Sequence, residues 1–216
     1  MTSAPLEQFP VLTETGIVLH GFTLRIPGLD VKTDRATALL RLEKYHAATL
    51  TALGNRSLQL AQQAHGKGIA VVDRQSARKT LDVDGLITRD PAVTLGIYVA
   101  DCCAIYLVDP IRSVIGLVHS GKKGTALNIA GESVRKMQES FGSDPAHMVA
   151  QLSPCIRPPN YEIDFAAEII LQLQSAGLQR IQDCCQNTGA DLKRFYSYRM
   201  EKGQTGRMLA FMALKG

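Results

Sequence analysis

The chain has 216 residues, of which 45% are hydrophobic and 20% are charged, and its formal net charge is +4. A chain of this length and apolar content can bury a substantial core without disulfides, which excludes a disordered tail protein. The mild positive charge, spread without blocks of Lys or Arg, argues against a dedicated nucleic-acid binder and suits a small anionic substrate or cosubstrate. No linker is visible, so we expect one domain over residues 1–216.

Targeting signals and cysteines indicate the compartment. Residues 1–19 lack a basic segment followed by an apolar one, so no signal peptide is expected, and no run of about 18 apolar residues predicts a membrane span. Four of the five cysteines form two adjacent pairs, Cys102 with Cys103 and Cys184 with Cys185. Adjacent cysteines rarely bond to each other, so we expect reduced thiols in a cytoplasmic protein that is not membrane-bound.

The first half of the chain reads as one strand, one helix and a series of strands. Residues 16–22 predict a strand, and residues 34–53 predict a helix with Asp34 as its N-cap and Gly54 at its end. Leu39, Leu42, Leu50 and Leu53 fit one face of that helix. Dense β-branched residues then predict strands at 57–63, 68–72, 84–88, 94–99, 104–108 and 114–118.

The second half contains the clearest helix. Leu127, Ala130, Val134, Met137 and Phe141 recur every three or four residues, which predicts a single helix over 124–141 that ends at Gly142. A strand at 148–152, a helix capped by Asp164 that runs to Gly177, and a closing strand at 207–214 complete the order. This alternation predicts a layered α/β domain with one mostly continuous core.

Three possible metal ligands stand at the ends of predicted strands. His65 precedes a glycine, Cys102 follows Asp101 between two apolar runs, and His119 ends the strand at 114–118. Two histidines and a thiolate are the kind of set that holds a catalytic zinc ion and leaves a position for water or substrate. Spacings of 37 and 17 residues do not by themselves specify such a site. Three separately satisfied polar residues remain an alternative at this point.

Basic residues next to glycines form two candidate anion sites. Lys122 and Lys123 lie between Gly121 and Gly124 at the start of the predicted helix, where free backbone N–H groups add to their charge. Arg199 and Arg207 flank a glycine turn near the C-terminus, and the arginine fork binds phosphate or carboxylate. A solvated turn and a salt-bridged surface hairpin are the respective alternatives.

Eight short elements occur along the chain in a recognisable order. They are 20–25 (HGFTLR), 62–66 (QQAHG), 84–88 (DGLIT), 100–102 (ADC), 119–124 (HSGKKG), 153–156 (SPCI) followed by 161–163 (YEI), 197–199 (SYR) and 205–208 (TGRM). Together they resemble the family long labelled multicopper polyphenol oxidoreductase or laccase-domain protein. Members of that family are mostly regarded as zinc-dependent purine nucleoside phosphorylases with adenosine deaminase activity.

The resemblance implies roles for individual residues. It implies that His65, Cys102 and His119 are metal ligands, and that the fold is a three-layer α/β fold shared with toxin deamidases, which use Cys and His as a catalytic pair. Cys102 therefore has two candidate roles, as a zinc ligand or as a nucleophile activated by His119. Asp101 or Glu162 is the candidate to protonate or orient the purine base.

The chain also departs from the family pattern. Lys122 and Lys123 replace a Trp-Arg pair, and Ala104 replaces a proline. The stretch after Arg25 lacks a glycine-rich segment and an S-L-N-L element. The expected ligands are intact while their surroundings differ, which indicates a divergent member.

Three functions follow as hypotheses. The first is zinc-dependent phosphorolysis of purine nucleosides (adenosine, inosine, methylthioadenosine), with Lys122, Lys123, Arg199 and Arg207 holding the phosphate, together with adenosine deamination by a water whose pKa the metal lowers. The second is a copper-dependent polyphenol oxidase, which the five histidines of the chain do not favour because a multicopper site needs many more. The third is a metal-binding domain with little activity. The expected partners are a nucleoside and phosphate, without nucleic acid or membrane.

Overall fold

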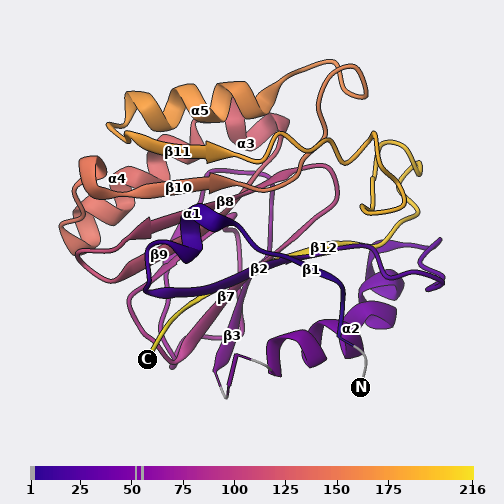
Figure 1. Ribbon diagram of the computed structural model, residues 1–216, viewed down its shortest axis with the longest axis horizontal. Coiled ribbons are helices and arrows are strands. Elements are labelled where there is room, and N and C mark those ends of the chain that lie inside the picture. The colour runs from indigo at the N-terminus through magenta and orange to yellow at the C-terminus, as the bar shows by residue number, and fades with distance from the viewer. Residues whose placement is uncertain (1–2, 52, 55) are drawn as a thin grey trace.

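The protein is described by a computed structural model that covers residues 3–51, 53–54 and 56–216. Twelve strands in these residues form two six-stranded sheets (Figure 1). In spatial order, the first sheet contains β1 (Leu6–Glu7), β2 (Val18–Thr23), β12 (Met208–Leu214), β7 (Val93–Val99), β3 (Ser57–Ala61) and β5 (Lys79–Thr80). The second contains β11 (Arg180–Asp183), β10 (Val149–Leu152), β8 (Cys103–Asp109), β9 (Val114–Ser120), β6 (Gly85–Thr88) and β4 (Ile69–Val71).

Both sheets are mixed. Their central pairs are antiparallel, and parallel pairs lie at the outer positions, where β3 joins β7 and β5, β4 joins β6, and β11 joins β10. The helices of the described residues are α1 (Pro10–Thr13), α2 (Arg35–Thr51), α3 (Lys122–Ala126), α4 (Ile129–Phe141) and α5 (Phe165–Ser175), with a 3₁₀ turn at Pro145–His147. The expected α/β class is therefore confirmed.

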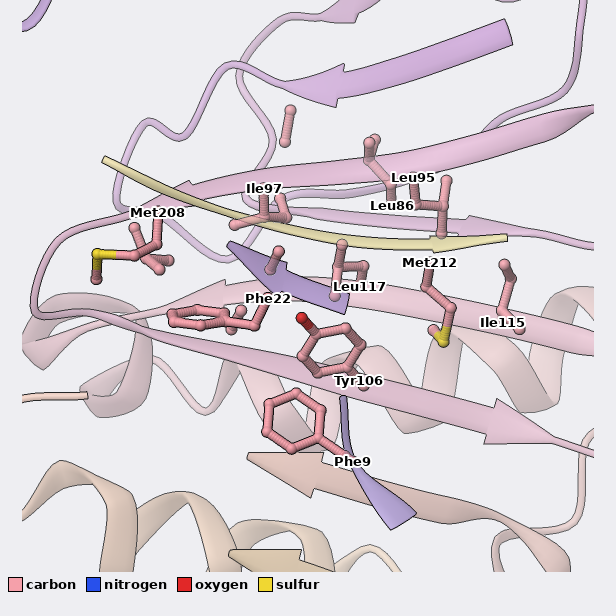
Figure 2. Close-up of a cluster of buried hydrophobic side chains, with 14 of the residues drawn as sticks. Phe9, Phe22, Leu86, Leu95, Ile97, Tyr106, Ile115, Leu117, Met208 and Met212 are labelled. Atoms are coloured by element: carbon pink, nitrogen blue, oxygen red, sulfur yellow. The ribbon is translucent and has the colours of Figure 1, made fainter. Parts of the chain in front are cut away.

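The largest apolar cluster lies between the two sheets. Phe22 and Ile97 from the first sheet meet Leu117 and Tyr106 from the second, and all four side chains are buried (Figure 2). The Tyr106 hydroxyl donates a hydrogen bond to the Gly21 carbonyl oxygen at 2.8 Å, so the polar end of this ring is satisfied inside the core. This bond ties β8 of one sheet to β2 of the other.

A second cluster covers the opposite face of the second sheet. Ile105 and Val118 point from the sheet toward Val134 and Met137 of α4 and Ile169 of α5. Figure 1 shows α4 and α5 on this side of the molecule and α2 on the other. The expectation of one mostly continuous core was wrong, because the second sheet is buried on both faces and separates two clusters. Burial on both faces also explains why its strands are apolar without alternation.

Several predicted helix ends are confirmed by their capping contacts. The Asp34 carboxylate accepts hydrogen bonds from the backbone N–H groups of Ala36 and Thr37. Asp164 accepts from Ala167 in the same way, and Gly142 ends α4 with φ of 67°. Residue 52, near the predicted end of the first helix, lies outside the described residues.

The helix predicted over 124–141 is in fact two helices. Asn128 adopts a left-handed conformation (φ 58°) between α3 and α4, and its side chain accepts a hydrogen bond from the backbone N–H of Gly131. The chain therefore starts a new, N-capped helix at this point. Leu127, which the periodicity placed on the buried face, is 47% exposed.

Some short elements of the structure leave no recognisable pattern in the sequence. The edge strands β1, β5 and β11 and the short α1 were not predicted. In β11 the residues are largely polar, and the strand is held by backbone pairing with β10, by packing of Ile181 on the second cluster and by the ion pair of Asp183 with Arg157. In the part of the chain that the structure describes, no helix is long and apolar enough to span a bilayer. All five cysteines lie in this part and are free thiols.

Candidate functional site

Strand pairing brings the three predicted ligands together. The β8–β9 pairing places Ala104 opposite His119, so Cys102, just before β8, lies next to the end of β9. The β6–β9 pairing places Gly85 opposite Val118 and therefore brings the start of β6 to the same edge of the sheet. His65 reaches this edge from the turn that follows β3.

The donor atoms of His65, Cys102 and His119 all lie within 4.8 Å of one another. The two imidazole rings are nearly perpendicular, with centroids 4.9 Å apart. His119 is buried, Cys102 is half-buried and His65 is exposed. The cluster is thus anchored in the protein on one side and open to a ligand on the other.

Asp84 contacts two of the three residues of this cluster, although it was not predicted as a site residue. Its buried carboxylate accepts hydrogen bonds from His119 Nδ1 at 2.8 Å and from the backbone N–H groups of His65 at 2.9 Å and Gly66 at 2.8 Å. Because Nδ1 of His119 donates to Asp84, Nε2 is the ring nitrogen left to bind a metal. The carboxylate thereby fixes both histidines.

The electrostatics of the cluster favour a thiolate. Burial raises the pKa of Cys102, but hydrogen bonds and charge from His119 and His65 outweigh it and lower this pKa to about 6. Burial lowers the pKa of His119, but Asp84 and Cys102 outweigh it and raise this pKa to about 9. A thiolate serves as a zinc ligand or as a nucleophile, so both candidate roles of Cys102 fit this environment.

Gly121 makes room for the sulfur. A Cβ atom at this position would lie 2.4 Å from Cys102 Sγ, which is closer than two atoms can approach. The backbone of Gly121 is extended (φ −117°), so its conformation alone does not require glycine. The glycine of the HSGKKG element is therefore explained by the packing of Cys102.

The backbone around the cluster is unusual. Gln63, His65 and Asp101 all have positive φ values, 66°, 60° and 85° respectively. Non-glycine residues rarely adopt this conformation, and it tends to occur at functional sites. Gln63 is held by two hydrogen bonds between its side-chain amide and the backbone of Tyr98, at 2.5 and 3.1 Å. These contacts hold the turn that carries His65.

A pocket of about 890 Å³ opens above the cluster. This volume lies within the range of sites for small molecules. The lining residues come from both sheets, from α2, α3 and α5, from the connections after β3, β7 and β10, and from the segment before β12. They are Arg35, Gln63, His65, Tyr98, Ala100, Asp101, Cys102, His119, Lys122, Ile156, Tyr161, Phe165, Tyr198, Arg199, Lys202, Gly203 and Arg207.

Arg207 is the most deeply buried arginine or lysine of this pocket. It is 8% exposed, and its Nη1 donates to the carbonyl oxygens of Thr205 and Gly206, both at 2.8 Å. Burial and the nearby Arg35 lower the pKa of its guanidinium. Among the described residues, no carboxylate forms an ion pair with Arg207. A buried cation with donors to spare is suited to a bound anion.

The other predicted anion-binding residues differ in their surroundings. Lys122 and Arg199 line the pocket and share a partner, Glu162, with Nζ and Nη2 lying 3.9 and 2.6 Å from its carboxylate. Lys123 is exposed and is not among the lining residues. The predicted lysine pair therefore contributes one residue to the pocket. The short α3 begins at Lys122, so the long helix expected to start there is absent from the described residues.

Asp101 lines the pocket, but its carboxylate is engaged. One oxygen accepts from the Thr188 hydroxyl at 2.8 Å and the other from the backbone N–H of Arg199 at 2.6 Å. Glu162, the other candidate to contact the base, is exposed and paired with two cations. These contacts make Asp101 a residue that joins the segments at 101, 188 and 199, rather than a free acid.

Sequence reasoning missed Asp84 and Arg35. Asp84 begins the DGLIT element, and a buried charged residue at the start of an apolar strand was the available signal. Arg35 is the first residue of α2, and no sequence motif marked it. Only the fold places it in the pocket.

Comparison with known proteins assigns the family. The chain matches the family model described as multi-copper polyphenol oxidoreductase laccase over residues 28–170 and 159–215. The protein therefore belongs to the multi-copper polyphenol oxidoreductase laccase family, as the eight elements indicated.

Relatives and solved structures agree with this assignment. The chain is 32% identical to a purine nucleoside phosphorylase of Deinococcus radiodurans, covering 91% of this chain and 89% of that protein. It is 29% identical to purine nucleoside phosphorylase YlmD of Bacillus subtilis, over 74% and 68% of the two chains. The crystal structure of YlmD from Geobacillus stearothermophilus superposes with a TM-score of 0.77, at 26% identity over 92% of both chains. These likenesses confirm the laccase-domain fold.

Proposed function

We propose that the protein is a zinc-dependent purine nucleoside phosphorylase that also deaminates adenosine. The observation that carries the proposal is the His65, Cys102 and His119 cluster on the wall of a pocket that also contains Arg207, which forms no ion pair within the described part of the chain. The names of the relatives support the phosphorylase part, since several are purine nucleoside phosphorylases. The substrates would be a purine nucleoside, such as adenosine, inosine or methylthioadenosine, and inorganic phosphate.

The donor set fits zinc. Two imidazole nitrogens and a thiolate are common zinc ligands, and three protein ligands leave a position for a substrate or water. His119 has one nitrogen held by Asp84, which is the arrangement expected of a metal-binding histidine. When bound, zinc would supply a Lewis acid beside the nucleoside.

Other residues of the pocket would bind the phosphate and the purine. Arg207, with Arg35 nearby, would hold phosphate through charge-assisted hydrogen bonds and orient it toward the ribose. Tyr161 and Tyr198 offer aromatic faces on which a purine can pack. Lys122 and Arg199, joined through Glu162, would close the outer edge of the pocket.

The test is turnover by the purified protein. With inosine and phosphate we expect hypoxanthine and ribose 1-phosphate, detected by chromatography, and no base when phosphate is omitted. With adenosine and no phosphate we expect inosine, which reports deamination separately. Absence of products from all of these nucleosides would leave a metal-binding domain with little activity.

The metal content is expected to be about one zinc per chain, because the described residues contain a single group of His, Cys, Asp and Glu able to hold an ion. His20 and His46 are buried elsewhere, and His147 pairs with Asp144 at the surface, so these histidines add no ligand to the cluster. Mass spectrometry of protein purified without added metal measures the content. Two or more coppers per chain, with oxygen consumption on phenols, would support the polyphenol oxidase instead.

Replacing Arg207 by alanine is expected to raise the KM for phosphate while sparing deamination. Loss of one charge-assisted contact costs about 1.5–3 kcal/mol, which corresponds to roughly 10- to 150-fold in KM. Arg56→Ala is a matched control, because Arg56 also donates to backbone carbonyls but lies outside this pocket. Equal loss of both activities in Arg207→Ala would indicate a structural role.

A further inference from the structure

Arg25, the last residue of the HGFTLR element, does not line the pocket. It contacts residues 194–196 and Glu201, in and just before the segment 197–207, which supplies several lining residues. It lies two residues after the end of β2, and its backbone N–H donates to the Arg194 carbonyl oxygen at 2.8 Å. Its Nε donates to the Phe195 carbonyl oxygen at 3.0 Å, and its guanidinium lies 4.4 Å from the centre of the Tyr196 ring. These contacts join Arg25 to residues 194–196, which directly precede the segment 197–207.

One carboxylate oxygen of Glu201 accepts hydrogen bonds from three donors. Its Oε2 accepts from Arg25 Nη2 at 2.5 Å, from the Ser197 backbone N–H at 3.1 Å and from the Thr205 hydroxyl at 2.6 Å. Ser197 begins the segment 197–207 and Thr205 lies near its end, whereas Arg25 lies two residues after the end of β2. One carboxylate therefore joins both ends of the segment to Arg25, just beyond the end of β2.

The segment 197–207 has no strand or α-helix of its own before β12. It nevertheless supplies five of the 17 residues that line the pocket, namely Tyr198, Arg199, Lys202, Gly203 and Arg207. Gly206 packs on the buried Tyr196 ring so closely that a Cβ atom would lie 2.8 Å from it. Arg207 directly precedes β12, so the sheet anchors it on one side and the contacts of residues 197–206 on the other.

We propose that the Arg25–Glu201 ion pair is a positioning pair, which holds the segment 197–207 so that Arg207 and Arg199 face an anion in the pocket. The proposal builds on the proposed function where it takes that anion to be phosphate. Neither Arg25 nor Glu201 lines the pocket, so both act through the segment and not on the substrate. Both side chains are mostly buried, at 19% and 24% exposure, which reduces screening of the pair by water.

The test compares Glu201→Gln with a matched control, Glu7→Gln. Glutamine keeps the size and an accepting oxygen at position 201 but loses the charge that pairs with Arg25. Glu7 forms a similar ion pair with Arg194 Nη2 at 2.9 Å, close in sequence but outside the segment 197–207. The readouts are amide hydrogen exchange of residues 197–207, binding of inorganic phosphate without nucleoside, and kcat and KM for phosphate.

In Glu201→Gln we expect the amide hydrogen exchange of residues 197–207 to become faster. We expect the Kd and KM for phosphate to increase about 10-fold and kcat to change less than about twofold, because a misplaced binding group chiefly weakens the positioning of the ligand. Arg25→Lys, which keeps the charge, should retain part of the affinity that Arg25→Gln loses. In Glu7→Gln all these values should match the wild type.

Two results would overturn the positioning role. The first is amide hydrogen exchange of residues 197–207 that is equally fast in Glu201→Gln and Glu7→Gln. The second is faster exchange of these residues in Glu201→Gln with an unchanged Kd for phosphate. If the wild type releases no purine base, the proposed function fails. The exchange and phosphate-binding measurements still decide the role of the ion pair, because neither requires turnover.

Discussion

Replacing Cys102 by serine is expected to remove zinc and phosphorolysis together. Serine keeps the two histidines but loses the soft anionic donor of the cluster. Because loss of an outer partner of a ligand alone costs about 10- to 100-fold in metal affinity or activity, we expect loss of this ligand to cost more than about 100-fold. Metal analysis and turnover are measured on the same preparation.

The alternative role of Cys102 predicts a different pair of results. If Cys102 is a nucleophile, Cys102→Ser keeps its zinc and loses turnover, and a thiol alkylator inactivates the wild type stoichiometrically at this residue. Cys102→Asp, which restores an anionic ligand, should retain some metal only if the residue is a ligand. Cys103→Ser is the control, since Cys103 is buried beside it and its sulfur faces the carbonyl oxygens of Ala104 and Ser153.

Replacing Asp84 by asparagine is expected to lower the affinity of the cluster for zinc. Asparagine has the same shape but presents an NH₂ group to one of the donors from His65, Gly66 or His119. If His119 Nδ1 must then accept a hydrogen bond, its proton moves to Nε2, which can no longer bind a metal. We expect zinc affinity to fall about 10- to 100-fold.

The stability of Asp84→Asn is expected to fall as well. A buried N–H group left without a partner costs about 1–3 kcal/mol, which urea unfolding of the metal-free protein would measure. Asp109→Asn is a matched control, because Asp109 is equally buried and binds two backbone N–H groups at the end of β8 without touching the cluster. Unchanged zinc affinity in Asp84→Asn would contradict the role of Asp84 in fixing His119.

Sequence patterns predicted most strands and helices because burial on one or two faces leaves a periodic or continuous apolar signal. They failed where a single residue redirects the chain, as Asn128 does between α3 and α4. They also failed for β11, whose four residues include a single apolar side chain, Ile181, and therefore show no apolar pattern.

The candidate site shows a similar division. The ordered elements located His65, Cys102 and His119, which the structure brings within 4.8 Å. They did not reveal that Glu162 pairs with Lys122 and Arg199, because the distances between loops depend on tertiary packing. Charge counting along a chain likewise cannot separate a lysine that lines a pocket, such as Lys122, from its neighbour that does not.

The contact between Gly121 and Cys102 Sγ constrains how this family can diverge. A side chain at position 121 would occupy the space of the sulfur, so the two positions cannot mutate independently while the cluster is kept. A homologue that has lost the cysteine is free to accept a larger residue at 121, whereas one that keeps it is not. A residue larger than glycine at this position therefore marks, from sequence alone, a relative whose cysteine cannot occupy the place it has here.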